Sequence, residues 1–448
     1  MERHVTDTLR STTRPSTHMH ALVGRVLEAS QDPRYVARKE MWTRHNRLDK
    51  TSKTPVYVCL KRGSGTNANP VTWSELIPFE QRLSKDRLER EIELQLRQKL
   101  YKHDNIPDDE VMSTTVWVGA VRAAADGEAK DVASGRIGSS FDVDHVDGAA
   151  SGPLWGLPFV ETRIGGPGGA YAVQPAVVED SDLDRLHWPP FQIDEAATRE
   201  LCERAEEIVG GRLPVKVATD AVGYSPTETM ISLMGMEAML FGVIDRPEFM
   251  HRIMDFVTEG TVQYQLARQA AGGVDYEQSW NYRVPYEDLP ADADPHRLSS
   301  CWPLVAAQSM CGISPTMYEE FVQPYHARLT QHLGQDRVYY HGCEDLTEKI
   351  PSILKLPNLR RLHISPWTDL ERAAELVGRD FVMEVVPHPE TIYSQTPAEM
   401  RAWLERAMDI AGDLVIDLVL GEIETVMGKP GVLSTWAQIA QEVAEERA

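Results

Sequence analysis

Hydrophobic and polar positions alternate regularly over the C-terminal third of the chain. Short runs rich in Val, Ile, Leu and aromatic residues stand between longer segments with helical periodicity. The predicted strands are Arg337–His341, Leu359–Ile364, Asp380–Val386 and Leu414–Leu420. The predicted helices are Leu346–Leu354, Asp369–Val377, Pro397–Ala411 and Leu433–Ala444, with start signals at Asp369 and Thr396. Four consecutive strand–helix units predict parallel strands joined by right-handed crossovers.

The same pattern continues upstream in a looser form. Further strands are expected at Val116–Val121, Leu213–Thr219 and Val274–Ser279, with a long helix over Pro247–Gly272. This repetition favours an α/β fold of the (β/α)8 TIM-barrel type over an open doubly wound sheet. No P-loop appears and no GxGxxG follows a strand, so the nucleotide-binding α/β folds have no support.

The N-terminal part has a different pattern. Residues 1–32 are polar and lack a long apolar period, which indicates a flexible tail. Residues 33–110 are mostly helical around one short apolar run, Pro55–Leu60, and Leu83–Tyr101 has apolar residues at i+4 steps. We therefore expect three parts: a tail over 1–32, a helical extension over 33–110 and a barrel over 111–448.

Composition narrows the class of protein. The 448 residues include 46 Lys and Arg against 68 Asp and Glu, a formal charge of −22 that argues against nucleic-acid binding. No apolar run approaches the ~18 residues of a membrane span, and the first residues lack the apolar stretch of a secretory signal. The five cysteines form no CxxC pair and suit reduced thiols. We expect a cytoplasmic protein with a small-molecule partner.

The sharpest chemical feature is His341-Gly342-Cys343, at the end of a predicted strand. Residues i and i+2 of a strand face the same side, and imidazole with thiolate is a ligand set that suits zinc. A third ligand is expected from another strand end, Glu422 first, with Glu384 or His388 as substitutes. The alternative is a hydrogen-bonded histidine beside a buried structural cysteine.

Other candidates follow from the rule that function gathers at the C-terminal ends of barrel strands. Glu344 and Glu384 are acids at such ends and are the candidate catalytic residues. The candidate substrate-binding residues are Trp280, Asn281, Tyr282, Trp302, Trp367 and His388.

Three segments resemble the uroporphyrinogen decarboxylase-like superfamily: Met234–Asp255, Gly312–Tyr325 and Ile364–Ala374. The resemblance runs from about residue 35 to the C-terminus and implies a TIM-type barrel with its cleft at the C-terminal strand ends. True members of the decarboxylase branch hold a polycarboxylate tetrapyrrole through an Arg-rich motif. The corresponding segment here, Cys59–Gly63, lacks that cluster, which argues against a porphyrinogen substrate.

The other branch comprises corrinoid-dependent methyltransferases, which carry His-x-Cys and a later third ligand on a zinc. His341 and Cys343 match the first two positions, and Glu422 stands where these enzymes place a further cysteine. The resemblance also marks Gln308 as a substrate-cleft residue. It leads us to expect an acidic residue two positions earlier, where this chain has Ala306.

The resemblance thus implies a zinc-dependent methyltransferase that moves a methyl group between a small substrate and a corrinoid (cobalamin). The chain has no DxHxxG motif, so the corrinoid is expected on a partner protein. One alternative is a decarboxylase or lyase of a small aromatic or heterocyclic acid, with Arg62 and Arg283 as its cations. Another is a non-catalytic tetrapyrrole-binding accessory protein. The oligomeric state stays open, and a homodimer is one option.

Overall fold

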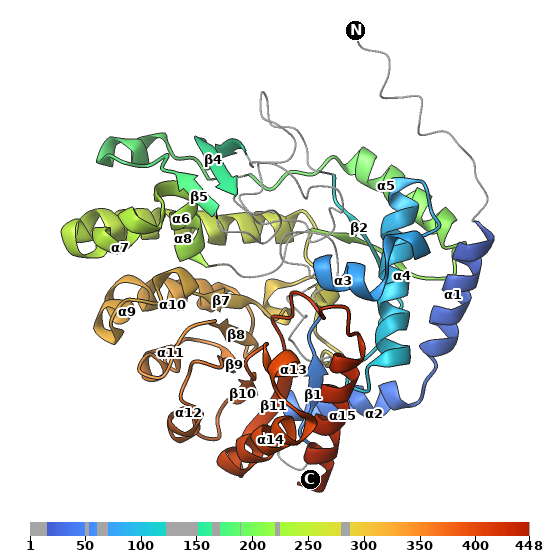
Figure 1. Cartoon of the computed structure of the whole chain (residues 1–448). Helices are drawn as coiled ribbons and strands as arrows, with labels where there is room; N and C mark the ends of the chain where they lie inside the picture. The colour runs from blue at the N-terminus through green and yellow to red at the C-terminus, as the bar shows by residue number, and fades with distance from the viewer. Residues whose placement is uncertain are drawn as a thin grey trace.

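The computed structural model (Figure 1) describes residues 16–49, 53–60, 70–121, 151–163, 171–188, 190–219, 225–278 and 287–447. Within them the chain forms a mixed α/β structure built around parallel strands. Trp280, Asn281, Tyr282, Arg62 and Arg283 lie outside the described residues, so their predicted roles stay predictions.

The main sheet has six strands, all parallel, in the order β1-β11-β10-β9-β8-β7. Their bounds are Val56–Val58 (β1), Leu304–Ala306 (β7), Val338–His341 (β8), Leu359–Ile364 (β9), Val382–Val385 (β10) and Val415–Leu420 (β11). A second parallel pair joins β2 (Val116–Gly119) to β6 (Val215–Ala218). The arrangement is compatible with a TIM-like fold. A separate antiparallel sheet contains β3 (Ser151–Leu154), β4 (Leu157–Arg163) and β5 (Tyr171–Gln174).

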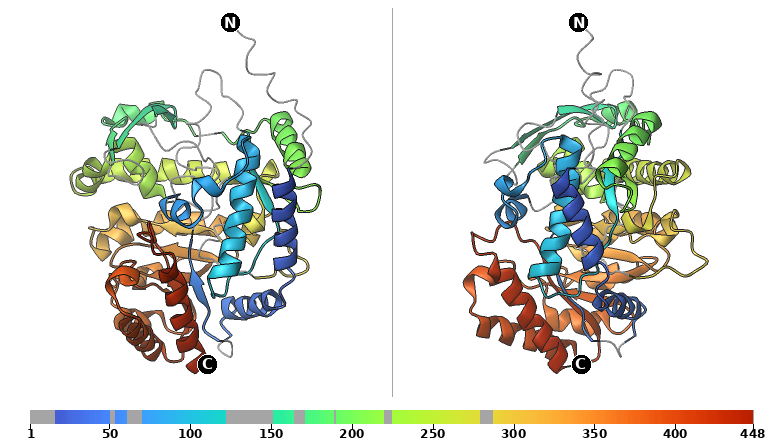
Figure 2. Two further views of the ribbon diagram at one scale, coloured as in Figure 1. Left: turned by 45° about the vertical axis from the view of Figure 1, so that its right-hand side comes forward. Right: turned by 90° about the vertical axis from the view of Figure 1, so that its right-hand side faces the viewer.

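Helices occupy most of the remaining described chain. The N-terminal and central ones are α1 (Thr17–Ala29), α2 (Arg34–Asn46), α3 (Pro70–Leu76), α4 (Arg87–Asn105), α5 (Glu195–Ile208), α6 (Pro226–Met234), α7 (Met236–Asp245) and α8 (Pro247–Ala270). The C-terminal ones are α9 (Pro315–Phe321), α10 (Gln323–His332), α11 (Ile350–Ile353), α12 (Leu370–Val377), α13 (Thr391–Ser394), α14 (Pro397–Ala411) and α15 (Gly431–Glu446). Figure 2 shows α14 and α15 side by side near the C-terminus, and α1 beside α4.

Local signals explain where the C-terminal helices begin. Asp369 caps α12 by accepting a hydrogen bond from the Arg372 amide. Thr396 and Glu399 form a reciprocal capping box at the start of α14, which satisfies two backbone donors of the first turn. The predicted order of strands and helices after residue 337 is therefore confirmed.

The two faces of β8–β11 differ in chemistry. Tyr340, Leu362, Met383 and Leu418 belong to the large apolar core that the C-terminal helices complete. Residues at alternating positions point the other way, and these are largely polar: Tyr339, His341, Arg361, His363, Glu384 and Asp417. We call this second set the polar face. It gathers ionisable side chains from four adjacent strands in a buried place.

The N-terminal half departs from prediction in two places. Residues 17–29, expected within a flexible tail, form α1, because Met19, Leu22, Val23 and Val26 make an apolar stripe that packs on α4. The run Pro55–Leu60, assigned to a helical extension, contains β1, which pairs with β11. A boundary near residue 110 thus separates residues that share one sheet.

The central region also differs from prediction. The expected strand Val274–Ser279 is wrong for its described part, where Tyr276–Gln278 is a single 3-10 turn. Elsewhere in this region, the Met-rich run Met230–Met239 is helical, as the spacing of its apolar residues indicates, and lies in α6 and α7, which separate at Gly235 with φ 79°. A positive φ is readily adopted by glycine and strains most other residues.

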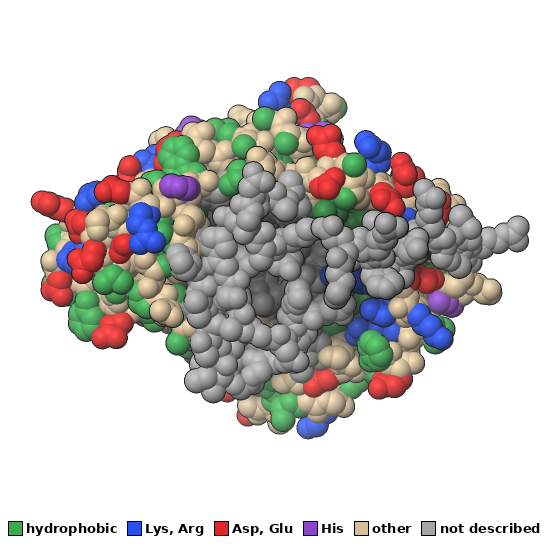
Figure 3. Space-filling view, turned by 90° about the horizontal axis from the view of Figure 1, so that it is seen from above, with side chains coloured by type: hydrophobic (Ala, Val, Ile, Leu, Met, Phe, Trp, Pro, Cys, Tyr) green, Lys and Arg blue, Asp and Glu red, His purple; other side chains and the backbone are tan. Residues whose placement is uncertain are grey.

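No single helix among the described residues has the length and apolar composition of a membrane span. Helices α6 and α7 meet that criterion only as a pair, and they are bent by 104°. Seen from above, acidic and basic side chains are interspersed around the described part of the surface (Figure 3).

Candidate functional site

Three metal-ligand side chains converge on the polar face where β8 and β9 end. His341 is the last residue of β8, Cys343 follows two positions later, and His363 is next to last in β9. One nitrogen of each imidazole and the Cys343 sulfur all lie within 4.8 Å of one another. His341 Nε2 is 3.2 Å from Cys343 Sγ, and the two imidazole centroids are 4.6 Å apart. We call this group the His-Cys-His cluster.

Strand register explains why these residues meet. Tyr340 is opposite Leu362 in the parallel β8–β9 pair. The next residues along both strands are His341 and His363, so their side chains share the face opposite to Tyr340 and Leu362. Gly342 then carries the backbone to Cys343, and a Cβ at residue 342 would lie only 2.7 Å from Glu344 Oε2. A side chain at residue 342 would therefore displace the Glu344 carboxylate.

The predicted pair His341 and Cys343 is thus brought together, but the third member differs from expectation. The cluster found among the described residues holds His363 and does not include Glu422, which comes two residues after β11 with φ 58°. His388 is about half exposed at its side chain and lies 3.8 Å from Glu390. Glu384 is fully buried and contacts His363 on the side of Nδ1.

A hydrogen-bonded layer lies directly behind the cluster. Glu384 Oε1 is 2.9 Å from His363 Nδ1 and accepts a hydrogen bond of 2.7 Å from the Tyr339 hydroxyl. The same hydroxyl oxygen is 3.1 Å from His341 Nδ1. Both histidines are therefore held by their Nδ1 atoms, and in His341 the other ring nitrogen, Nε2, is the one beside Cys343.

Arg361 and Asp417 form a buried ion pair next to this hydrogen-bonded layer. Arg361 donates to Asp417 Oδ2 at 2.6 Å and lies 3.5 Å from Glu384 Oε2. Burial alone would favour the neutral form of Arg361, but the carboxylates of Asp417 and Glu384 outweigh it and raise the arginine pKa. The guanidinium thus remains charged between two carboxylates.

Helix α2 contributes one more side chain to this interior. His45 Nε2 is 2.9 Å from Asp417 Oδ2. Burial lowers the pKa of His45 in spite of that carboxylate. The ring is therefore neutral, and its single N–H donates a hydrogen bond to Asp417 Oδ2. The N-terminal region therefore reaches the polar face at β11.

Glu344, predicted as catalytic, lies beside the cluster. Its side chain folds back against Gly342 and is mostly buried. Burial raises its pKa to about 7, although the nearby Lys349 ammonium acts in the opposite direction. Lys349 donates to the carbonyl oxygens of Met310 and Cys311. A glutamic acid with this pKa holds a proton for part of the time at neutral pH.

The predicted substrate residues fall into separate groups. Trp367 and His388 meet edge to face, with ring centroids 5.5 Å apart, just beyond the ends of β9 and β10. Gln308 begins a 3-10 turn two residues after the end of β7 and is partly exposed. Trp302 is buried two residues before β7 begins, at the opposite end of that strand from His341, which argues against a substrate contact.

Sequence reasoning missed His363 and Tyr339. Both lie inside predicted strands, whereas candidates were sought among the residues at and after the C-terminal ends of the strands. A usable signal was present: Arg361 and His363 are polar residues at alternating positions of the predicted strand Leu359–Ile364. Such a pattern places both on one face.

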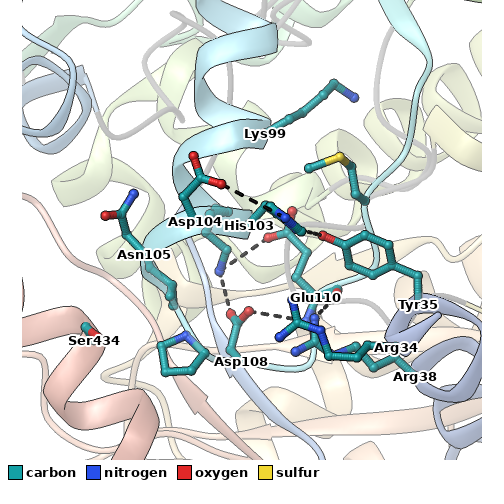
Figure 4. Close-up of a pocket in the computed structure, with 14 residues that line it drawn as sticks. Arg34, Tyr35, Arg38, Lys99, His103, Asp104, Asn105, Asp108, Glu110 and Ser434 are labelled. Atoms are coloured by element: carbon teal, nitrogen blue, oxygen red, sulfur yellow. Dashed lines mark hydrogen bonds and ion pairs between the residues drawn. The ribbon is translucent and has the colours of Figure 1, made fainter. Parts of the chain in front are cut away.

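The structure also contains a pocket of about 360 Å³ away from the cluster (Figure 4). It lies between α2, the last turn of α4, the segment that follows α4, and Ser434 of α15. Its lining includes Arg34, Arg38, Lys99, Lys102, His103, Asp104, Asp108 and Glu110. We call it the charged pocket.

No family model matches the chain, and no curated protein matches it. Among solved structures, the chain is similar to a methyltransferase from Methanosarcina mazei. The two share 13% sequence identity with a TM-score of 0.48, over 90% of this chain and 98% of the other. A likeness at this level defines neither fold nor activity, so the function has to be argued from the site itself.

Proposed function

We propose that this chain is a zinc-dependent methyltransferase built on a closed (β/α)8 barrel. The observation that carries the proposal is the convergence of His341, Cys343 and His363 at adjacent strand ends. Two imidazoles and one thiolate form a three-ligand set that zinc accepts, and catalytic zinc sites typically keep a fourth position open.

The surroundings of the cluster fit such an ion. Metal-binding histidines usually pass their other ring N–H to a carboxylate or another acceptor, and Glu384 and Tyr339 stand at the two Nδ1 atoms. His341 and His363 belong to β8 and β9 and Cys343 follows β8 by two residues, so two strands hold the imidazoles. Glu422, which the sequence analysis expected as the third ligand, remains the alternative to His363 in that role.

The proposed reaction moves a methyl group between a small substrate and the cobalt of a corrinoid (cobalamin) on a partner protein. Zinc in this site would act as a Lewis acid on the heteroatom that carries or accepts the methyl group. Glu344 would hold a proton on its carboxylate and give it to the heteroatom that loses the methyl group. Trp367, His388 and Gln308 are the described residues proposed to contact the substrate.

The first test is the metal itself. We expect the purified chain to bind about one zinc ion. A four-ligand zinc site is worth roughly 10–16 kcal/mol, so loss of one ligand such as His363→Gln should weaken zinc binding about 100- to 1000-fold. His341→Ala and Cys343→Ser should do the same, whereas His388→Gln and Glu422→Gln should not.

Chelator competition measures these affinities, and two results would overturn the assignment. If Glu422→Gln weakens zinc binding and His363→Gln does not, the third ligand is Glu422. If the wild-type chain transfers methyl groups at full rate without metal, the zinc proposal fails.

The second test is the reaction. The zinc-loaded chain is incubated with cob(I)alamin and methylated oxygen, sulfur or nitrogen compounds, and methylcobalamin is followed by its visible spectrum. Formation that depends on Cys343 supports the proposal. Corrinoid-independent release of carbon dioxide from a panel of aromatic acids would instead support the decarboxylase alternative.

A further inference from the structure

The positions of hydrogen atoms behind the cluster can be worked out from the heavy atoms. Glu384 Oε1 is contacted by Tyr339 at 2.7 Å and by His363 at 2.9 Å. All three side chains are almost completely buried. Arg361 lies 3.5 Å from the other Glu384 oxygen, and a guanidinium at that place favours the ionised carboxylate. An ionised carboxylate only accepts hydrogen bonds.

The hydrogen of each partner is then assigned. Because Glu384 cannot donate, the Tyr339 hydroxyl gives its single hydrogen to Oε1, and His363 Nδ1 must carry a hydrogen that it also gives to Oε1. The Tyr339 oxygen is left as an acceptor. His341 Nδ1, 3.1 Å from that oxygen, must therefore donate to it.

The consequence concerns the atoms that would touch a metal. A neutral imidazole carries one N–H, so both rings have an unprotonated Nε2. For His341, Nε2 is the atom that lies 3.2 Å from Cys343 Sγ. The lone pair that a metal needs is thus directed toward the sulfur of Cys343, which as a thiol can donate its S–H to it.

We infer that Tyr339 and Glu384 are positioning residues that fix the tautomer of both histidines through one shared carboxylate oxygen, so that Nε2 of each ring keeps its lone pair for a metal. This inference rests on the proposed zinc site and adds residues that the His-x-Cys pattern does not contain. Loss of such a supporting partner typically lowers metal affinity 10- to 100-fold.

The strand offers a matched control. Tyr340 is the next residue of β8, equally buried, but its side chain belongs to the apolar core on the helix side. Tyr340→Phe and Tyr339→Phe therefore remove the same hydroxyl group from the two faces of one strand. A general loss of stability affects both variants, whereas a change of tautomer affects only Tyr339→Phe.

The experiment has two readouts on the full chain. Two-bond 1H–15N spectra of protein with labelled histidine report the tautomers without metal, and chelator competition reports the affinity for zinc alone. In the wild type and in Tyr340→Phe we expect Nδ1–H tautomers for His341 and His363. In Tyr339→Phe, His341 should shift toward the Nε2–H form, with zinc bound 10- to 100-fold more weakly. Glu384→Gln should affect both rings.

The possible failures can be told apart. If Tyr339→Phe and Glu384→Gln keep both tautomers and the wild-type zinc affinity, the inference is wrong and the zinc site stands. If the wild type shows both Nδ1–H tautomers but binds no zinc, the tautomer assignment stands and the proposed function fails.

Discussion

The charged pocket and the His-Cys-His cluster are two polar regions of one molecule with opposite organisation. In the charged pocket, cations and anions neutralise one another: Lys102 Nζ is 2.5 Å from Asp108 and 3.3 Å from Glu110. Lys99 donates to two backbone carbonyls, and the Tyr35 hydroxyl is 2.7 Å from His103. In the cluster, two nitrogens and one sulfur converge, and all three are electron-pair donors.

The difference shows that a pocket lined by charged side chains is not by itself the better candidate for chemistry. Charges that are already paired with protein groups stabilise the fold and have little capacity left for a ligand. Converging donors of one kind repel one another unless a cation or a set of hydrogen bonds compensates them. The charged pocket therefore has the organisation of a structural site, and the cluster that of a binding site.

The largest expected effect is a loss of stability when the charged pocket is mutated, without any change at the His-Cys-His cluster. Lys102→Met removes a buried ammonium from Asp108, Glu110 and the Val58 carbonyl. Breaking a buried ion pair by removing one partner costs about 3–5 kcal/mol, because the remaining charges lose their compensation. We expect that decrease in the free energy of urea-induced unfolding, with the zinc affinity unchanged.

The control for this variant is Lys355→Met, an exposed lysine paired with Glu319. It should change the unfolding free energy by less than about 1 kcal/mol, as exposed ion pairs do. If Lys102→Met is as mild as this control, or if it weakens zinc binding, the proposed division between the two regions is incorrect.

The same two regions show how far the sequence could predict the structure. The bounds of β9 and α14 agree with the predicted Leu359–Ile364 and Pro397–Ala411, because buried strands and capped helices carry their signals locally. His341 and Cys343 could be found for the same reason, since they lie two residues apart at the end of one strand, β8.

The remaining features depend on contacts between distant segments. His363 joins the cluster only because of the register of β9 against β8. That register cannot be predicted from the local sequence pattern of either strand. The charged pocket depends on α2 packing against the end of α4. The α1 stripe (Met19, Leu22, Val23 and Val26) was readable at helical spacing, but the polar residues around it suggested a tail.

A smaller effect comes from a buried histidine that belongs to neither region. His326 of α10 packs against Tyr318 and Tyr340 on the helix side of β8. Burial lowers its pKa from 6.5 to about 4. Between these values the unfolded chain binds a proton that the folded chain does not, so stability falls as the pH decreases.

We expect this histidine to reduce the unfolding free energy by about 2 kcal/mol between pH 7 and pH 5. His326→Phe should remove that part of the pH dependence, measured as the difference between the unfolding free energies of wild type and variant at each pH. An unchanged difference from pH 7 to pH 5 would mean that His326 titrates normally in the folded chain. The acid sensitivity would then have to come from other groups, such as those of the polar face.

The smallest expected effect tests the rim of the charged pocket. Arg34 pairs with Asp32 at 2.6 Å, but the arginine side chain is more than half exposed. Hydrogen bonds from Arg34 lower the pKa of Asp32 to about 2, and Arg34→Ala should return it toward 3.8, as an NMR titration of the carboxyl group would show. Because water screens this pair, we expect a loss of less than about 1 kcal/mol in unfolding free energy, smaller still at high salt. A loss as large as that of Lys102→Met would mean that the rim and the buried base of the pocket form one cooperative network, since an isolated exposed pair has too little electrostatic energy to produce it.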